Sequence, residues 1–185
     1  MNIRGRKSLN LYPMSSTKYI LVEVLFPLFL AGCIYLLFRP EDTVVYRLTE
    51  TLGFIELVDV FRLRYSPSGL PEWFVYSLPG GLWLLAFQNI LTWANKFKGK
   101  RLVFFVFSAL LIGVGLEVAQ AFHFTDGRFD WIDLLFYVGA TVVAFSNVWL
   151  VQKKWQLYTE SAVSSRLMGG VFVLFTVIIY LADII

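Results

Sequence analysis

Long apolar blocks constrain the fold of this chain more than any other feature. Of its 185 residues, 58% are hydrophobic and 16% are charged, whereas soluble domains carry about 25% charged residues. The blocks are about 20 residues long, which is the length that a helix needs to cross the roughly 30 Å hydrocarbon core of a bilayer. We therefore predict an all-α, polytopic transmembrane bundle that forms a single domain, with five spans at 19–38, 72–93, 102–122, 131–151 and 167–183.

Basic residues predict the orientation of these spans, because they gather in the short connections on the cytoplasmic side of a membrane. With the N-terminus in the cytoplasm, the C-terminus and the long connection 39–71 lie outside. Apolar residues recur at helical spacing in that outer loop, which predicts a helix on the membrane surface at about 42–62. The cytoplasmic segments then hold eleven of the sixteen basic residues: Arg4, Arg6, Lys7, Lys18, Lys96, Lys98, Lys100, Arg101, Lys153, Lys154 and Arg166.

Composition excludes several classes of function. The single Cys33 excludes an intrachain disulfide and a cysteine-based metal site, and the single His123 excludes a multi-histidine metal site. The basic residues are spread between apolar blocks rather than along one stripe, which argues against a nucleic-acid surface. We therefore expect no metal, no cofactor and no nucleic-acid partner.

The first predicted span has three unusual features. Residues 30–33 are similar to a lipoprotein cleavage box, but the chain stays apolar after Cys33, so a membrane span is the better interpretation. Pro27 is expected to bend the helix, because proline lacks an N–H and its ring crowds the preceding turn. Glu23 lies about one turn inside the span, where we expect it to snorkel or to pair with Lys18.

The second predicted span contains a helix break at Pro79, Gly80 and Gly81, about two turns below its outer end. Pro79 cannot donate a hydrogen bond to the carbonyl of Val75, and inside a membrane such a carbonyl needs a partner from protein or water. The role of the break stays open between a packing kink and the shaping of a cavity.

Polar residues join the third and fourth predicted spans. Glu117 and Gln120 share one helix face, and Asp133 and Tyr137 share a stripe on the next helix. A short hairpin makes these helices adjacent and antiparallel, so the four side chains are expected to converge near the outer surface, with Arg128 folded between Glu117 and Asp133. The polar residues of the connection are Glu117, Gln120, His123, Asp126, Arg128, Asp130 and Asp133.

Two interpretations of this outer polar cluster stay open. In the first it only fixes the hairpin, with Asp130 capping the fourth helix and Asp126 in an ordinary turn. In the second it is a functional site, because ionisable residues at the edge of a span are rare. Glu117 and Asp133 are then the candidate catalytic acid and base, although no nucleophile–base pair or phosphate loop supports a reaction. The candidate binding residues are Glu117, Gln120, Arg128, Asp130, Asp133 and Tyr137.

The order of Glu117, Gln120, Arg128 and Asp133 resembles the pattern of the VanZ-like family of polytopic bacterial membrane proteins. In that family a Glu and a Gln three residues apart precede an Arg, an Asp that opens the next helix, and then an Asn and a Gly. Tyr137 stands where the family has Asn, and Gly139 falls one residue early, so either the helix phase differs or the chain resembles a divergent member. The resemblance covers residues 115–141 and implies a multi-pass protein of the bacterial inner membrane with an envelope role, linked to glycopeptide (teicoplanin-type) resistance.

Three functions compete at this point. The favoured one is a non-enzymatic envelope protein that binds membrane lipids, a lipid-linked precursor or a glycopeptide at the outer polar cluster. The second is a scaffold or assembly subunit of a membrane complex. The third is an intramembrane acid–base enzyme that acts on an envelope lipid.

Overall fold

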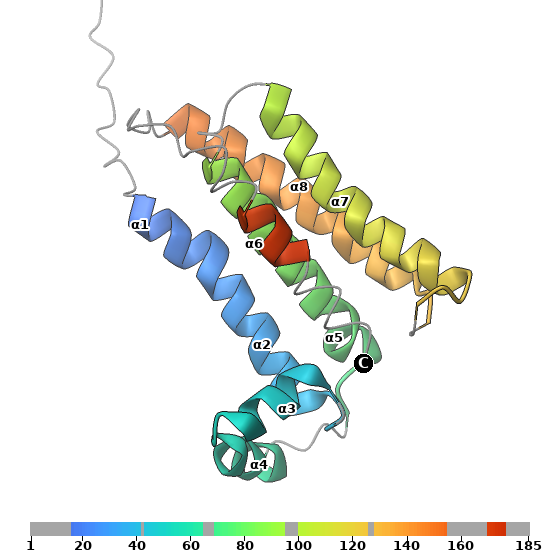
Figure 1. Cartoon of the computed structure of the whole chain (residues 1–185). Helices are drawn as coiled ribbons and strands as arrows, with labels where there is room; N and C mark the ends of the chain where they lie inside the picture. The colour runs from blue at the N-terminus through green and yellow to red at the C-terminus, as the bar shows by residue number, and fades with distance from the viewer. Residues whose placement is uncertain are drawn as a thin grey trace, which may run out of the picture.

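Four long helical segments form a bundle, and every regular element of the described residues is helical (Figure 1). This computed structural model describes residues 16–41, 43–64, 69–94, 100–125, 128–154 and 170–176. The helices long and apolar enough to span a membrane are Thr17–Phe38, Glu72–Ala94, Leu102–Ala121 and Trp131–Leu150. They match the first four predicted spans to within a few residues, and they indicate a polytopic membrane protein.

The fifth predicted span, 167–183, is described only at 170–176. That segment is helical and lies against α6 (Ser77–Ala94), where the ring of Phe175 stacks on Phe87 at 4.9 Å between centroids. The rest of the predicted span lies outside the described residues. The number of five spans and the orientation of the termini therefore stay predictions.

The first span consists of α1 (Ser16–Tyr19), the π-helical turn η1 (Ile20–Leu25) and α2 (Phe26–Phe38). Pro27 explains the wide turn, because its ring would clash with the carbonyl of Glu23 in a regular helix and it has no N–H to offer that carbonyl. The side chain of Asn89 replaces the missing donor, with Nδ2 at 2.9 Å from the Glu23 carbonyl oxygen. A residue of another span thus completes this turn.

The second span consists of α5 (Glu72–Val75) and α6, which are separated at Tyr76. The interruption was expected at residues 78–81, so it lies slightly earlier. The helix restarts at Ser77, which places Pro79 in a first turn, where a missing N–H costs little. Arg39 compensates the freed carbonyl groups: Nε lies 3.4 Å from the oxygen of Val75, and Nη2 lies 2.9 Å from that of Tyr76.

Helix α6 is the centre of the bundle and contacts η1, α2, α5, α7 (Lys100–Ala121) and α8 (Trp131–Lys154). In an apolar stretch of 18 residues from each span, 56% of the residues are buried in the second span, against 22–28% in the other three. The second span is also the least hydropathic of the four. Lipid-facing positions must be apolar, whereas positions between helices can be small or polar. The low hydropathy of the second span is therefore consistent with its burial between the other helices.

Small residues let α8 approach its neighbours closely. A Cβ on Gly81 would lie 2.9 Å from Cβ of Phe136, and a Cβ on Gly80 or Gly113 would lie 3.3 Å from the ring of Tyr137. The Tyr137 ring therefore lies in a slot between α6 and α7. Ala140 and Ala144, which lie one turn apart on α8, are both buried.

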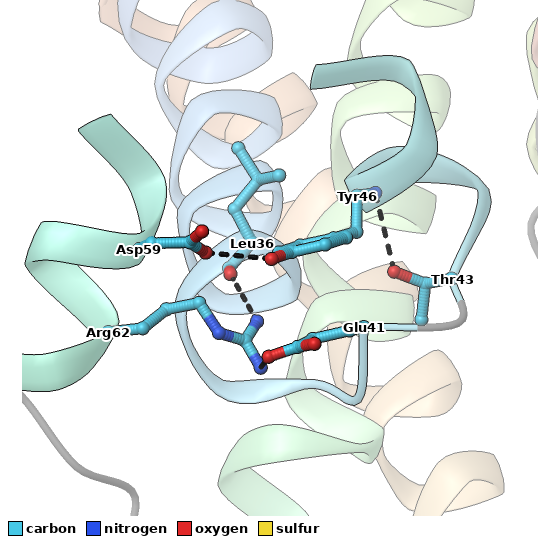
Figure 2. A network of polar contacts seen from close by, with 6 residues as sticks. All are labelled: Leu36, Glu41, Thr43, Tyr46, Asp59 and Arg62. Atoms are coloured by element: carbon cyan, nitrogen blue, oxygen red, sulfur yellow. Dashed lines mark hydrogen bonds and ion pairs between the residues drawn. The ribbon is translucent and has the colours of Figure 1, made fainter. Parts of the chain in front are cut away.

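The outer loop forms two helices, α3 (Val44–Thr51) and α4 (Ile55–Arg64), rather than the single helix expected at 42–62. The chain turns at Gly53, whose φ of 75° suits glycine. Figure 2 shows how polar contacts hold this hairpin against the end of α2: the Tyr46 hydroxyl donates to Asp59 at 2.7 Å, and Arg62 Nη1 donates to the Leu36 carbonyl at 2.8 Å.

Candidate functional site

Glu117 is the most buried member of the outer polar cluster, with 3% of its surface exposed. The Tyr137 hydroxyl donates to its Oε1 at 3.4 Å, and the backbone N–H of Asp130 donates to its Oε2 at 3.3 Å. Glu117, on α7, therefore ties that helix to the beginning of α8. The predicted convergence of Glu117, Tyr137 and Asp133 is seen, and Gln120 is buried one turn further along α7.

Asp133 and Ser77 form the second part of the cluster. The side chains of Ser77 and Glu117 both lie within interaction range of the Asp133 carboxyl. Ser77 Oγ and Asp133 Oδ1 are nevertheless buried without a hydrogen-bond partner of good geometry. Sequence reasoning missed Ser77, although a hydroxyl just before a predicted helix break was a signal. The cluster thus draws on the second, third and fourth spans.

The cation that reaches this cluster is Arg39, not Arg128. Arg39 lies close enough to interact electrostatically with Asp133. Its guanidinium is held over the ring of Tyr35 at 4.1 Å and by the Tyr76 carbonyl at 2.9 Å. Arg128 is exposed, and no ion pair joins it to Glu117 or Asp133.

Two other predicted residues have local roles. Asp130 caps α8, because its Oδ1 accepts the backbone N–H of Ile132 at 2.8 Å. His123 is exposed and closes α7, since it adopts a φ of 57° and donates its N–H to the Gln120 carbonyl at 3.0 Å. Asp126 lies outside the described residues.

An apolar groove of about 380 Å³ runs between α6 and α8, and its lining includes Leu78 and Phe136, which are sequence neighbours of Ser77 and Tyr137. Gly81 and Leu82 line one wall, and Phe136, Gly139 and Ala140 line the other. Gly81 follows Ser77 by about one turn, so the groove begins near the unpartnered hydroxyl. The glycine-containing break is therefore associated both with close packing and with a cavity.

A second polar cluster lies deeper in the bundle and joins three spans. Asn147 Nδ2, on α8, donates to Glu23 Oε2 at 2.7 Å and lies 3.5 Å from Asn89 Oδ1. The Tyr19 hydroxyl donates to Asn89 Oδ1 at 3.2 Å. Sequence reasoning expected Glu23 to snorkel or to pair with Lys18, whereas the structure turns it toward these amides. No periodic signal connects residues 124 positions apart in the sequence.

The chemistry of the outer polar cluster suits binding better than bond cleavage. Glu117 already accepts two hydrogen bonds, while Ser77 and Asp133 keep unpartnered atoms. In the described part of the chain, no group of three or more His, Cys, Asp or Glu residues is placed to hold a metal ion. Comparison of the chain with models of known protein families, with curated protein sequences and with solved structures finds no match.

Proposed function

We propose that this chain is an integral protein of the bacterial inner membrane that binds an amphipathic envelope lipid or a lipid-linked precursor. The head group binds at the outer polar cluster, and the acyl chain lies in the groove between α6 and α8. One observation carries this proposal: two buried polar atoms without partners, Ser77 Oγ and Asp133 Oδ1, belong to the same helix turns as the groove residues Leu78 and Leu135. The function is non-enzymatic.

Energetics support a ligand at this place. A buried polar atom without a partner costs about 1–3 kcal/mol. A head group that donates a hydrogen bond to Asp133 and accepts one from Ser77 removes both costs together. The groove, at about 380 Å³, is within the roughly 300–1,000 Å³ range of small-molecule sites.

Charge favours a zwitterionic head group. The carboxylates of Glu117, Asp130 and Asp133 attract an ammonium or a hydroxyl donor, while Arg39 and Arg128 at the same end of the bundle attract a phosphate. Arg39 is the better placed of the two, since it interacts with Asp133. Phosphatidylethanolamine has both groups and is the first lipid to test.

The test is native mass spectrometry of the protein purified in mild detergent. Wild type is expected to retain a specific lipid, and Ser77→Ala/Asp133→Leu is expected to retain at least tenfold less of it, a loss of about 1.4 kcal/mol. Ser146→Ala is the matched control, because Ser146 is an exposed serine on α8 whose hydroxyl bonds only to its own helix. Equal lipid retention in folded wild type and double variant contradicts the proposal.

The resemblance of residues 115–141 to the VanZ-like pattern supports an envelope role and a link to glycopeptide resistance. That link is tested separately, by the teicoplanin susceptibility of cells that express wild type or Asp133→Asn at equal levels. Equal susceptibility of both strains counts against a role of this cluster in resistance.

An assembly subunit is the second candidate, and the α3–α4 hairpin favours it. This hairpin turns Asp59 and Arg62 inward and leaves large apolar side chains outside, among them Leu57 and Leu63, which is 86% exposed. Exposed apolar surface of this kind marks contact with lipid or protein. If Leu57→Ser/Leu63→Ser releases a co-purifying protein while lipid retention is unchanged, the assembly function is favoured.

A further inference from the structure

We propose that Glu23 is an intramembrane proton-binding site, separate from the outer polar cluster and independent of lipid binding. It lies six residues into the first span, which corresponds to about 9 Å of helix. The second and fourth spans meet it there. Its ligand is a proton taken from the aqueous phase at the N-terminal end of that span.

Residues of the first, second and fourth spans surround Glu23. Asn147 donates to its carboxylate at 2.7 Å, and Asn89 donates to its backbone carbonyl at 2.9 Å. Tyr19, 1% exposed, anchors Asn89 through a hydroxyl contact of 3.2 Å. The carboxyl group is therefore held by the Asn147 amide and the backbone carbonyl by the Asn89 amide, in a turn whose π geometry is common at functional sites.

Within the part of the chain that the structure describes, the charge of this carboxyl group has no counterion. Among the described residues, no ion pair involves Glu23, and the groups facing it are Tyr19 from its own helix, Asn89 from α6 and Asn147 from α8. Tyr19 is the only titratable one of the three. An isolated carboxylate in an apolar medium is costly, and such groups bind a proton instead.

A purely structural role does not explain the choice of residue. A glutamine at position 23 would accept the same amide hydrogen bond at a lower desolvation cost, and α6 already holds a glutamine, Gln88, at a fully buried position. What the carboxyl adds is the ability to exchange a proton. The position is therefore suited to a protonation site rather than to a static contact.

Protonation of Glu23 forms one O–H bond and breaks no covalent bond of the protein, but it changes the hydrogen bonds around the carboxyl group. One proton joins a carboxylate oxygen of Glu23, which then becomes a donor. The Asn147 amide keeps the other carboxyl oxygen as its acceptor, but that hydrogen bond loses its charge assistance and becomes weaker. The proton thereby alters the contact between the first and fourth spans.

The experiment is an infrared titration of the protein in nanodiscs, following the C=O stretch of protonated carboxyl groups. Wild type is expected to show a titrating band that is lost in Glu23→Gln and kept in Glu56→Gln, which removes an exposed carboxyl of the outer hairpin. Asn147→Leu is expected to move the midpoint of that band. A merely structural role of Glu23 predicts no such band.

Identical titrations of wild type and folded Glu23→Gln overturn the proposal, because they show that Glu23 stays ionised throughout. If Glu23→Gln does not fold, Glu23→Asp replaces it and keeps a titratable carboxyl on a shorter side chain. The band is then expected to shift, and an unmoved band also overturns the proposal. Lipid retention is measured on the same samples, so a failure here is distinguishable from a failure of lipid binding.

Discussion

At the scale of single residues, the absence of a side chain matters as much as the presence of one. Gly81 allows α8 to lie against α6, because a Cβ there would be 2.9 Å from Cβ of Phe136, and both of these carbons are fixed by helical backbones. Gly115, in the middle of α7, has nothing within 4 Å of the same position. Two helical glycines thus differ completely in what they contribute.

We expect Gly81→Ala to lower the stability of the protein by about 1–3 kcal/mol, because an extra methyl group in a tight contact forces the helices apart. Gly115→Ala, the matched control, is expected to be neutral or to stabilise by about 0.5–1 kcal/mol, since alanine favours a helix over glycine. Thermal unfolding in detergent measures both. Equal effects of the two substitutions would show that the α6–α8 contact is looser than described.

The second prediction at this scale concerns the pKa of Tyr46. The hydrogen bond to Asp59 raises the pKa of Tyr46 to about 12 from its ordinary 10.0, with partial burial and the nearby negative charge adding to the effect. Since the folded-state pKa is the higher one, this stabilisation is complete below pH 10 and is lost as pH rises towards 12. Asp59→Ala should return the Tyr46 pKa towards 10.0, as followed by ultraviolet titration with Tyr46→Phe as the blank.

At the scale of elements, each of the first two spans supplies a hydrogen bond that a proline removes from the other span. Asn89 of α6 supplies the hydrogen bond that Pro27 withholds from Glu23, and Arg39 at the end of α2 supplies the one that Pro79 withholds from Val75. One contact lies at each end of the pair. Together they fix the register of the two helices, because neither carbonyl can stay unpaired in lipid.

We expect Asn89→Leu to destabilise the protein by about 1–3 kcal/mol, because it leaves the Glu23 carbonyl unpaired. In a Pro27→Ala background the loss should shrink by about 0.5–3 kcal/mol, since an alanine in place of the proline restores an N–H for that carbonyl. Arg39→Ala is the control, because it acts at the other end of the span and should cost the same in both backgrounds. A fully additive Asn89→Leu/Pro27→Ala pair would refute this explanation of the π turn.

At the scale of the whole molecule, the least apolar span occupies the centre and the most apolar spans surround it. Helix α6 buries Ser77, Gln88, Asn89 and Thr92, and the other spans expose large apolar side chains such as Phe29, Phe104 and Leu135. This inversion of the soluble pattern follows from the bilayer, which solvates apolar surface and penalises polar surface.

The predicted topology is tested by cysteine labelling in cells after Cys33→Ala removes the only native thiol. A membrane-impermeant maleimide should react from outside with Glu41→Cys and Phe124→Cys, and with Thr17→Cys only after permeabilisation. All three native positions are exposed. The reverse pattern would invert the topology. Ile185→Cys should react from outside if the chain has five spans.

The sequence alone determined the four long helices and the buried face of the third. The first span was predicted at 19–38 and is found at Thr17–Phe38, and the predicted common face of Glu117 and Gln120 on α7 is buried. Span length and helical periodicity are local properties, and the bilayer thickness is a fixed external length. These features can therefore be read without knowing which helices are neighbours.

Only the tertiary structure decided which side chains meet across helices. It brings Arg39 rather than Arg128 towards Asp133, adds Ser77 to the outer polar cluster, and joins Glu23 to Asn147. Helical periodicity shows which residues share a face of one helix, but not which face of another helix they contact. The carbonyl groups freed by the two prolines could likewise have accepted hydrogen bonds from other donors. That choice depends on how all the helices pack together, so it is a property of the assembled bundle.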